Sequence, residues 1–402
     1  MNLLFVHEVN WWTKVVYEIH ELPELLSQRG HDVTLIDFPE GVSRRGFRRL
    51  LDLKTSIVRD ARRAYDAGVV EVRTPGRVFP PPLDRLLATL TFAPLLRRTI
   101  REKQPDVIVL YGVPTNGWQT IRIARKFRIP VVFRALDVSH ALRKSVFVRL
   151  IERAERFIYK NAHFISANNE ALAKYCVSQG ARAELVEVRY PGMDLQSLIP
   201  QTRDMELAVS LGIKPTDHVV MFMGTLYRFA GLDTFLELMA PTLHGSTDIK
   251  VLLIGGGEHL DVLKNNCKRL GIADQVIFTG FVDYRELTKY MTIADVAINT
   301  FPSTLVTNCA LPSKVLQYLC CGIPTVATPV DGLAGLIPDG QGILYRDLDP
   351  NFIRTITSLM NDDDLLQEIS RLARSTAERL LDWRTNLPPM EDDLMTVWRI
   401  SK

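Results

Sequence analysis

Cysteine and long apolar runs are both scarce in this sequence. It has five cysteines, an odd number, and no C-x-x-C pair. This argues against the disulfide framework of a small secreted domain and suits a reducing compartment. Cys320 and Cys321 fall next to each other in an apolar segment, where packing is the expected role. No apolar run approaches the ~20 residues of a membrane-spanning helix, so none is predicted.

A secretory signal and a metal-binding pattern are also missing. The apolar part of Met1–Glu8 is too short for a signal peptide, and an acid follows at once. We therefore expect a cytoplasmic protein. The histidines show no metal-ligand spacing, and the acidic run Asn361–Asp364 is typical of a solvated helix cap.

The net charge of +3 conceals a difference between the two halves. Residues 1–200 contain 31 Lys and Arg against 21 Asp and Glu, a net of +10, whereas the remaining residues have a net of −7. This asymmetry indicates an anionic partner for the first half alone. A membrane surface, an acidic saccharide and a lipid-linked phosphate all fit it.

Short apolar runs alternate with longer amphipathic segments over almost the whole length. The expected strands of the first half are Leu3–Val6, Val33–Asp37, Val107–Tyr111, Val131–Arg134 and Phe164–Ser166, with helices such as Val16–Gln28 and Trp118–Phe127. Those of the second half are Val219–Met223, Lys250–Ile254, Val276–Thr279, Val296–Asn299 and Thr325–Ala327, with helices Leu232–Leu243, His259–Leu270, Tyr284–Met291 and Ser313–Leu319. Alternating strands and helices predict parallel sheets covered on both faces. Two such sets predict two Rossmann-like, doubly wound α/β domains in tandem.

The break between the two sets falls near Tyr190–Asp194 and the polar stretch that continues to Asp217. We expect an N-terminal domain over residues 1–195 and a C-terminal domain over residues 196–380. Residues 381–402 are expected to form a helical crossover that packs back on the N-terminal domain.

The stretch Ser43–Tyr65 interrupts the alternation. Its apolar residues recur at roughly helical spacing, and its arginines fall mostly on the other side. A basic amphipathic helix of this kind can lie on an anionic bilayer. An ordinary surface helix with a solvated basic face explains the pattern equally well.

Residues Phe222–Asp233 include groups suited to a phosphate. Gly224 closes the first strand of the second set, and Gly231 opens the next helix, whose free N–H groups suit an anion. Arg228 between them can add a charged fork to a diphosphate, or be an exposed loop arginine. The triplet Gly255–Gly257 lets a ligand approach closely or makes a tight turn, and it is not the G-x-G-x-x-G pattern of NAD binding.

The clearest sequence signal for a phosphate-binding site is the stretch Ala310–Ala327. Pro312 suits the first turn of a helix, which places Ser313 and Lys314 at the positive end where a diphosphate can bind. Gln317 lies one turn further on and is expected to point the same way.

Taken in order, these segments resemble the donor-binding half of the family 4 glycosyltransferases of the GT-B fold. The matching pieces are Phe222–Leu226, Gly231–Asp233, Leu253–Gly257, Val276–Val282, Ala294–Val296, Pro312–Lys314 and Gly322–Val326. Three others, Gly30–Val33, Tyr190–Asp194 and Leu381–Trp383, resemble the family's second-strand turn, interdomain entry and C-terminal crossover. The resemblance therefore spans nearly the whole chain.

The resemblance implies two Rossmann-like domains facing across a cleft, with a nucleotide-diphosphate sugar on the C-terminal domain and the acceptor on the N-terminal one. It also implies a retaining transfer with no metal ion and no cofactor. Arg228 and Lys314 would offset the diphosphate charge, the main catalytic demand when no metal is present. The implied donor contacts are Gly224, Thr225, Arg228, Gly256, Thr279, Phe281, Asn308, Ser313, Lys314 and Gln317.

The sequence departs from the family at its glutamates. The two that are usual eight residues apart, near the transferred sugar and on the ribose, are Cys309 and Gln317 here. Gln317 can still hydrogen-bond a ribose, and Asn308 can reach a sugar hydroxyl. Thr225 and Ala230 replace the usual basic pair of the phosphate loop.

On the acceptor side, Asn10, Trp11, Trp12 and Lys14 occupy the loop after the first strand, where the family usually has paired glycines. We expect these residues to contact the acceptor, because such strand-end loops face the cleft in this architecture. The tryptophans can instead form part of the cleft wall.

Asp137 follows another strand, and the histidine that the family has just before it is Leu136 here. Asp137 can orient an acceptor hydroxyl or be a satisfied turn residue. His140, the nearest imidazole, is a catalytic candidate or a structural residue. The catalytic candidates are Asp137, His140, Arg228 and Lys314.

These features favour a retaining glycosyltransferase of cell-surface polysaccharide or glycoconjugate biosynthesis. Its acceptor would be a saccharide, a lipid-linked group or a small molecule, with peripheral membrane contact and no nucleic acid. The replacements Cys309 and Gln317 leave open a degenerate relative that binds a nucleotide sugar as the partner of an active transferase. A sugar-nucleotide epimerase is a third reading, for which no acid/base pair is placed.

Overall fold

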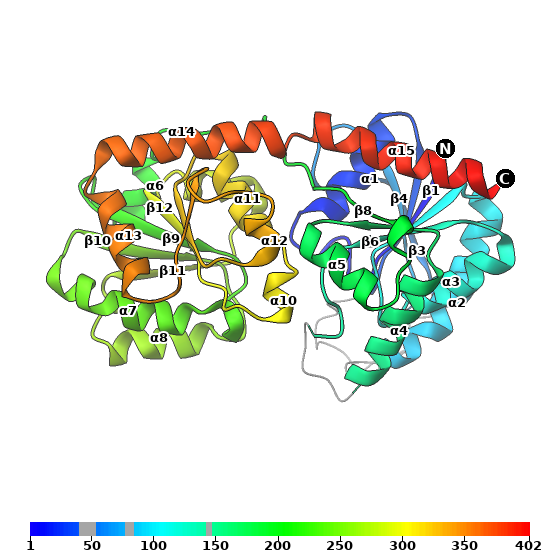
Figure 1. Cartoon of the computed structure of the whole chain (residues 1–402), viewed down its shortest axis with the longest axis horizontal. Helices are drawn as coiled ribbons and strands as arrows, with labels where there is room; N and C mark the ends of the chain where they lie inside the picture. The colour runs from blue at the N-terminus through cyan, green and yellow to red at the C-terminus, as the bar shows by residue number, and fades with distance from the viewer. Residues whose placement is uncertain (40–53, 77–83, 142–146) are drawn as a thin grey trace. The chain divides into compact units, whose positions relative to one another are not determined.

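A computed structural model describes residues 1–39, 54–76, 84–141 and 147–402 (Figure 1). The chain divides into two compact units. Unit 1 comprises Met1–Pro191 and Asn386–Lys402, and unit 2 comprises Gly192–Thr385. Each unit is built around one sheet with parallel pairing throughout its centre. The predicted fold class, two Rossmann-like α/β domains, is confirmed.

Unit 1 contains an eight-stranded sheet in the order β3-β4-β2-β1-β5-β6-β7-β8. Its strands are β1 (Asn2–Val6), β2 (Asp32–Ile36), β3 (Ser56–Ala61), β4 (Val70–Thr74), β5 (Val107–Leu110), β6 (Val131–Ala135), β7 (Phe164–Ala167) and β8 (Val186–Val188). The central strands are buried almost throughout. Burial on both faces explains their nearly continuous apolar runs, from which they were predicted.

Helices cover both faces of this sheet. Those of unit 1 are α1 (Glu18–Gln28), α2 (Asp84–Lys103), α3 (Gly117–Phe127), α4 (Val148–Asn161), α5 (Glu170–Ser178) and α15 (Trp383–Ser401), which starts in unit 2. Figure 1 shows α15 on the same side as α1, where Glu391 pairs with Arg29 and His31 at 2.6 Å each. On the other side α2 packs against α3, and α3 against α4.

The helix predicted within residues 43–65 is wrong for the part that the structure describes. Residues 43–53 lie outside the described residues. Beyond them, β3 pairs antiparallel with β4 at the edge of the sheet. The neighbouring β-branched residues Ile57 and Val58 favour a strand, and backbone pairing with β4 outweighs the weak helical spacing.

Unit 2 contains a six-stranded parallel sheet in the order β11-β10-β9-β12-β13-β14. The strands are β9 (His218–Met223), β10 (Ile249–Ile254), β11 (Val276–Gly280), β12 (Val296–Asn299), β13 (Thr325–Ala327) and β14 (Ile343–Tyr345). The helices are α6 (Met205–Ser210), α7 (Leu232–Gly245), α8 (Leu260–Arg269), α9 (Leu287–Met291), α10 (Leu305–Asn308), α11 (Ser313–Cys320), α12 (Asp331–Ala334), α13 (Pro350–Met360) and α14 (Asp363–Leu380). The carboxyl ends of β9, β10 and β12 therefore share one edge of the sheet.

Three smaller predictions can be compared with the structure. Asp362 caps α14 by accepting a hydrogen bond from the Leu365 N–H, which confirms the acidic run as a helix cap. All five cysteines are buried, and burial raises the pKa of the Cys321 thiol to about 12. No helix within the described ranges is both long and apolar enough to cross a membrane.

A buried ion pair ties α1 to the centre of the unit 1 sheet. The guanidinium of Arg134, on β6, donates to both carboxylate oxygens of Glu18 at 2.6 and 2.8 Å. Arg134 also donates to Ser166 Oγ, while the hydroxyl of Tyr111 donates to Glu18. Both charged side chains are almost completely removed from solvent. Neither charge can lose its partner without a large desolvation penalty.

Replacing Glu18 by alanine is therefore expected to lower the free energy of unfolding of unit 1 by about 3–5 kcal/mol, because Arg134 stays buried without a counter-charge. Glu187→Ala removes an exposed carboxylate that lies 3.5 Å from Arg189 and is the matched control. Its expected cost is below about 1 kcal/mol. Chemical denaturation measures both, and equal small costs would contradict a structural role for the buried pair.

Candidate functional site

Lys314 extends its ammonium group across the carboxyl end of β9. Its Nζ lies 3.7 Å from the centre of the Phe222 ring and 4.3 Å from that of Phe301. A Cβ atom added at Gly224 would lie 3.6 Å from the same Nζ. The residue as a whole is only half-buried, but desolvation of the ammonium lowers its pKa well below the ordinary value of 10.5. No carboxylate among the described residues forms an ion pair with it.

Two backbone features place Lys314 there. Pro312 precedes the first turn of α11, where the Val315 N–H donates to the Pro312 carbonyl at 3.0 Å and the N–H groups of Ser313 and Lys314 have no intrahelical acceptor. Further along α11, the Tyr318 hydroxyl accepts a hydrogen bond from the Met223 N–H at 2.7 Å. This bond holds α11 against the end of β9, and the start of the helix thus joins its partial positive charge to that of Lys314.

The glycine triplet 255–257 is explained by the packing of two loops. Gly255 has φ +128°, and a Cβ there would lie 2.1 Å from the carbonyl oxygen of Gly224. The Leu226 N–H donates to the Gly256 carbonyl at 2.9 Å. Gly256 faces the ring of Phe281, which is 71 % exposed. Backbone contact therefore accounts for the glycines, as the tight-turn alternative states.

The other predicted donor residues form no side-chain hydrogen bond or ion pair with Lys314 among the described residues. Arg228 is exposed in a 3-10 turn (Arg228–Ala230) and has no ion pair within the described part of the chain. Thr279, at the end of β11, donates to the Gly280 carbonyl. Asn308 exchanges hydrogen bonds with Ser303 at the end of α10.

Three further donor candidates differ in exposure. Ser313 is exposed at the first position of α11, and Thr225 is half-buried just after Gly224. Gln317 lies one turn after Lys314 and is buried, with its side chain bonded to no described residue. Cys309, at the position of the family's first glutamate, is also buried.

On unit 1, the loop after β1 is organised around Asp37. The Asp37 carboxylate accepts hydrogen bonds from the Asn10 amide and the Trp11 N–H at 3.1 Å each. The Asn10 side-chain oxygen accepts in turn from the N–H groups of Trp12 and Thr13. Asn10 thus shapes the loop through contacts within the protein.

The two tryptophans of this loop have different environments. Trp11 is completely buried, with its ring 4.6 Å from that of His20. The expectation that Trp11 stacks on an acceptor is therefore corrected, because no face of its ring reaches solvent. Trp12 is 41 % exposed and is the tryptophan of the pair that can meet a ligand.

Asp137 and Lys14 are brought close enough to interact electrostatically. Desolvation raises the pKa of the Asp137 carboxyl, and the charge of Lys14 opposes that shift. The residue as a whole is nonetheless exposed to solvent. The two residues follow β6 and β1, which places an acid and a base at the same edge of the sheet.

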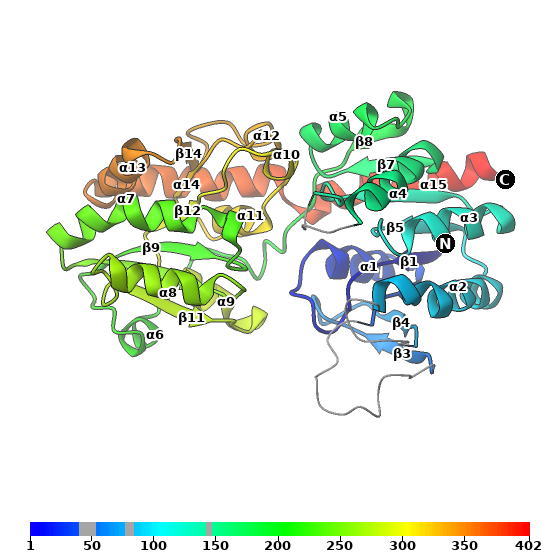
Figure 2. The same ribbon diagram turned by 90° about the horizontal axis from the view of Figure 1, so that it is seen from below.

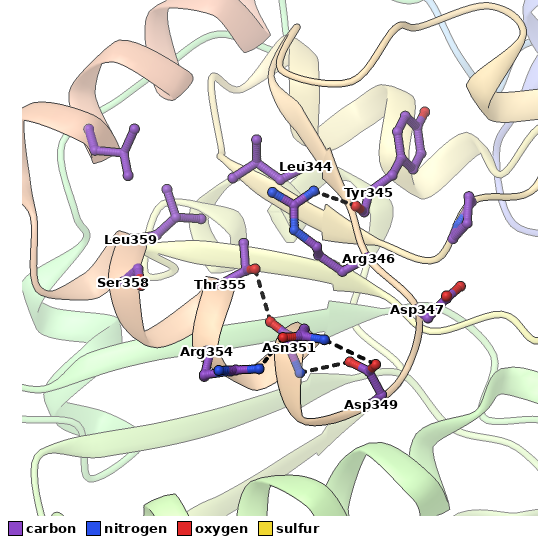
Figure 3. Close-up of a pocket in the computed structure, with 12 residues that line it drawn as sticks. Leu344, Tyr345, Arg346, Asp347, Asp349, Asn351, Arg354, Thr355, Ser358 and Leu359 are labelled. Atoms are coloured by element: carbon purple, nitrogen blue, oxygen red, sulfur yellow. Dashed lines mark hydrogen bonds between the residues drawn. The ribbon is translucent and has the colours of Figure 1, made fainter.

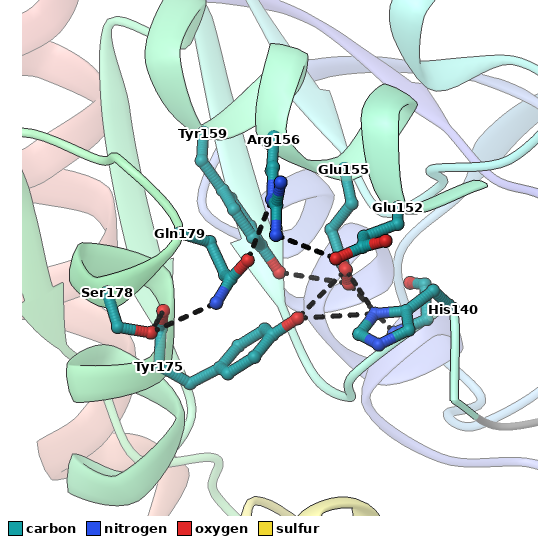
Figure 4. Close-up of polar contacts among 9 residues, drawn as sticks. His140, Glu152, Glu155, Arg156, Tyr159, Tyr175, Ser178 and Gln179 are labelled. Atoms are coloured by element: carbon teal, nitrogen blue, oxygen red, sulfur yellow. Dashed lines mark hydrogen bonds and ion pairs between the residues drawn. The ribbon is translucent and has the colours of Figure 1, made fainter. Parts of the chain in front are cut away.

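His140 is held by a buried carboxylate (Figure 4). Glu155, on α4, lies 2.7 Å from His140 Nδ1 and accepts hydrogen bonds from the Tyr175 hydroxyl and the Ser139 N–H. The hydroxyl of Tyr159 donates to the same carboxylate at 3.2 Å. This network orients the imidazole through Nδ1. It also holds the loop after β6 against the middle of α4 and against α5.

Sequence reasoning missed Glu155 and Tyr318. A glutamate on the apolar side of an amphipathic helix, among Ala154, Ile158 and Tyr159, is a signal that could have identified Glu155. Tyr318 shows no comparable signal, because it occurs in a uniformly apolar segment. Asn299, at the end of β12, was also missed; both of its buried amide atoms are without a hydrogen-bond partner among the described residues.

A cavity of about 660 Å³ lies elsewhere in unit 2, between β14 and α13 (Figure 3). None of the predicted site residues lines it. Its polar groups largely satisfy each other: Asp349 accepts from Asn351, and the Arg346 guanidinium donates to the Tyr345 carbonyl. The uncompensated cation at β9 is the stronger indication of a binding site. Among the described residues, no group of three His, Cys, Asp or Glu is arranged to hold a metal ion.

Comparison with known protein families matches both halves of the chain. Residues 205–376 match the family described as glycosyl transferases group 1, and residues 15–192 match the glycosyl transferase 4-like domain. The chain is 24 % identical over 332 residues to the sulfoquinovosyl transferase SQD2 of Arabidopsis thaliana, covering 80 % of this chain and 62 % of that protein. It is 28 % identical over 235 residues to a D-inositol 3-phosphate glycosyltransferase of Paenarthrobacter aurescens, covering 56 % of each. The matches thus span less than two thirds of these relatives.

Solved structures show the same fold. The structure of Anabaena Alr3699/HepE in complex with UDP aligns with a TM-score of 0.74 at 18 % identity, covering 98 % of this chain and 100 % of that one. A sucrose-phosphate synthase from Thermosynechococcus elongatus aligns with a TM-score of 0.77 at 15 % identity, covering both chains completely. The fold of this chain is therefore GT-B.

Gly231 provides a test of how α7 is placed beside the site. It has φ +74°, and a Cβ there would lie 2.0 Å from the Thr300 carbonyl oxygen. We expect Gly231→Ala to destabilise unit 2 by roughly 1–3 kcal/mol and to weaken nucleotide binding, because the loop before α7 must move. Gly245→Ala at the other end of α7 meets no atom within 4 Å and is the control. Thermal unfolding that shifts equally in both variants would contradict the assigned contact.

Proposed function

We propose that this chain, which belongs to the group 1 glycosyltransferases with a 4-like N-terminal half, transfers a sugar from a nucleotide-diphosphate sugar to an acceptor hydroxyl. The observation that carries the proposal is the desolvated ammonium of Lys314 at the end of β9. A cation in that state, beside the start of a helix, favours binding of an anion. A diphosphate has the charge to fit it.

The donor belongs on unit 2, and a uridine nucleotide is the first candidate. The crystal structures of Anabaena Alr3699/HepE were determined with UDP, with UDP and glucose, and with UDP-glucose. We infer a similar donor class for this chain from the shared fold and the family match. Gln317 is placed to meet the ribose, one turn from Lys314.

In the proposed reaction, the bond between the sugar's anomeric carbon and the diphosphate oxygen breaks. A new bond to the acceptor oxygen forms, and the acceptor hydroxyl loses its proton. Negative charge grows on the leaving diphosphate, and Lys314 with the start of α11 stabilises it. We propose that no metal ion takes part and that the anomeric configuration is retained, as in the family that the sequence resembles.

On unit 1, Asp137 can accept a hydrogen bond from the acceptor hydroxyl, since the residue is exposed and interacts electrostatically with Lys14. Trp12 offers an exposed ring on the neighbouring loop. We propose a saccharide, lipid-linked or small-molecule acceptor of polysaccharide or glycoconjugate biosynthesis. The Asp137 carboxylate and the Trp12 ring support this acceptor class.

A second candidate function is a partner protein that binds the nucleotide sugar without transferring it. The observation that favours it is the replacement of two carboxylates by the buried Cys309 and Gln317. Incubation with UDP-, GDP- and dTDP-sugars, with and without candidate acceptors, separates the two by release of nucleotide. Donor binding with no release under any condition would favour the partner protein. Absence of all nucleotide binding would rule out both.

Lys314→Ala is expected to weaken UDP binding by about 1.5–3 kcal/mol, the scale of a charge-assisted contact. Isothermal titration calorimetry measures the change. Lys268→Ala, which removes an exposed charge on α8, is the control and should leave the affinity unchanged. An unaltered affinity in Lys314→Ala would remove Lys314 from the diphosphate site.

The depressed pKa of Lys314 also predicts the pH dependence of binding. A bound diphosphate stabilises the ammonium and raises its pKa again. Between the free and the bound pKa, binding takes up a proton, so UDP affinity should fall as pH rises through that interval, by up to about tenfold per unit. Lys314→Arg stays charged throughout and should bind UDP with little pH dependence in that range. Parallel pH profiles in both proteins would contradict the assignment.

A further inference from the structure

The exposed charged side chains of helices α2, α3 and α4 of unit 1 are almost all positive. The exposed cations on these helices and at the α3 C-cap are Arg98, Arg101, Arg122, Arg125, Lys126, Arg128, Arg149, Arg153, Arg156 and Lys160. Among the residues of these helices whose exposure is described, Glu102 is the one exposed carboxylate, and Glu152 is half-buried. We call this surface the α2–α4 basic face; Figure 2 shows the three helices that carry it.

The pattern is most regular on α4. Four of the cations recur every three or four residues, a spacing that places them along one side of a helix. They are Arg149, Arg153, Arg156 and Lys160. The opposite side buries Ala154, Glu155, Ile158 and Tyr159 against the rest of the unit. The outward side of α4 is thus a continuous basic stripe.

Most of this charge is not neutralised. Arg98 pairs with Glu102, and Arg156 with Glu152, but the other eight cations have no ion pair among the described residues. On the opposite side of unit 1, Arg29 pairs with Glu391 and Arg189 with Asp393, whereas the exposed Arg399 of α15 has no ion pair among the described residues. The eight unpaired cations on three neighbouring helices create a positive field that attracts anions to this face.

Exposed apolar side chains accompany the cations. Phe147 is 44 % exposed and Leu150 is 58 % exposed at the start of α4, next to Arg149. Leu90, on α2, is 61 % exposed. Basic residues interleaved with exposed aromatic and leucine side chains are typical of surfaces that lie in the interface of a bilayer.

We propose that the α2–α4 basic face is the surface on which unit 1 lies against an anionic phospholipid bilayer. Its arginines and lysines contact the lipid headgroups, and Leu150 enters the boundary between headgroups and acyl chains. A soluble acidic polymer would pair with the cations, but it would offer no apolar region for Leu150 to enter. This face is distinct from residues 43–65, whose described part includes an edge strand rather than a basic helix.

The proposal deepens the proposed function and rests on it in one respect, the choice of acceptor. Glu155, on the buried side of the middle of α4, accepts from the Ser139 N–H and bonds His140, so α4 is tied to the loop that follows Asp137. A bilayer against the outward side of α4 is therefore separated from that loop by the helix itself. An acceptor carried by a lipid is the class that this geometry suits.

Sedimentation with vesicles tests the surface directly, without any donor or acceptor. The full chain is expected to bind phosphatidylcholine vesicles with roughly one third phosphatidylglycerol, and to bind pure phosphatidylcholine vesicles weakly. The double variant Arg149→Gln with Arg153→Gln should lose about thirtyfold in affinity, if each cation contributes the usual amount. The control, Lys264→Gln with Lys268→Gln on α8 of unit 2, removes two exposed helical cations and should leave binding unchanged. No binding to the anionic vesicles, or equal losses in both variants, would overturn the proposal.

Leu150→Gln separates a bilayer from a soluble polyanion. It should weaken vesicle binding several-fold and leave retention on an anionic resin such as heparin-agarose unaltered. If vesicle binding is insensitive to Leu150→Gln while the arginine variant is lost from the resin, the face binds soluble polyanions and the bilayer proposal fails. Unfolding curves and UDP binding are measured for each variant. A chain that binds UDP but not vesicles contradicts this proposal alone, whereas one that binds vesicles but no nucleotide contradicts the proposed function alone.

Discussion

The donor side of this protein depends on one energetically costly arrangement. The ammonium of Lys314 is partly removed from water, and no carboxylate in the described part of the chain pairs with it. The rings of Phe222 and Phe301 give Lys314 a weak electrostatic partner, but they do not restore the lost hydration. The depressed pKa reflects this cost, because the desolvated ammonium loses its proton more easily when no anion is bound. A bound diphosphate would remove the penalty, and the free energy it recovers would appear as affinity. The Tyr318 hydroxyl, by accepting from the Met223 N–H, keeps α11 in the position that this exchange requires.

The periodicity of the sequence was enough to predict the central strands of both sheets, because each of them is buried on both faces and forms a continuous apolar run. The same reasoning missed β4, β8 and β14, and it failed at β3, an edge strand whose exposed residues show no such run. It also misjudged Trp11. A tryptophan in a strand-end loop gives the same sequence signal whether its ring points toward solvent or packs against His20. Position in the chain indicated the loop correctly, but only tertiary packing decides which of two adjacent rings is exposed.

The catalytic candidates show a similar division. The motif around Pro312 was sufficient to predict that Lys314 stands at a helix start, whereas its position at the end of β9 comes from tertiary packing. The role of Glu155 depends on groups from separate segments, among them Ser139, His140 and Tyr175, and no local pattern joins them. The network makes His140 part of a rigid support for the loop after β6, which is how a residue can position an acceptor site without reacting. The basic face extends this logic, because α4 connects that loop to a surface suited to lipid.

The most direct measurement of the central claim is the pKa of the Lys314 side chain itself, followed by NMR with specifically labelled lysine. In the free protein the account predicts a value well below 10.5, and addition of UDP should raise it as the diphosphate stabilises the ammonium. Lys268, exposed on α8, provides the internal reference and should not respond to UDP. A Lys314 signal that titrates at the ordinary value and does not change with UDP would contradict the account.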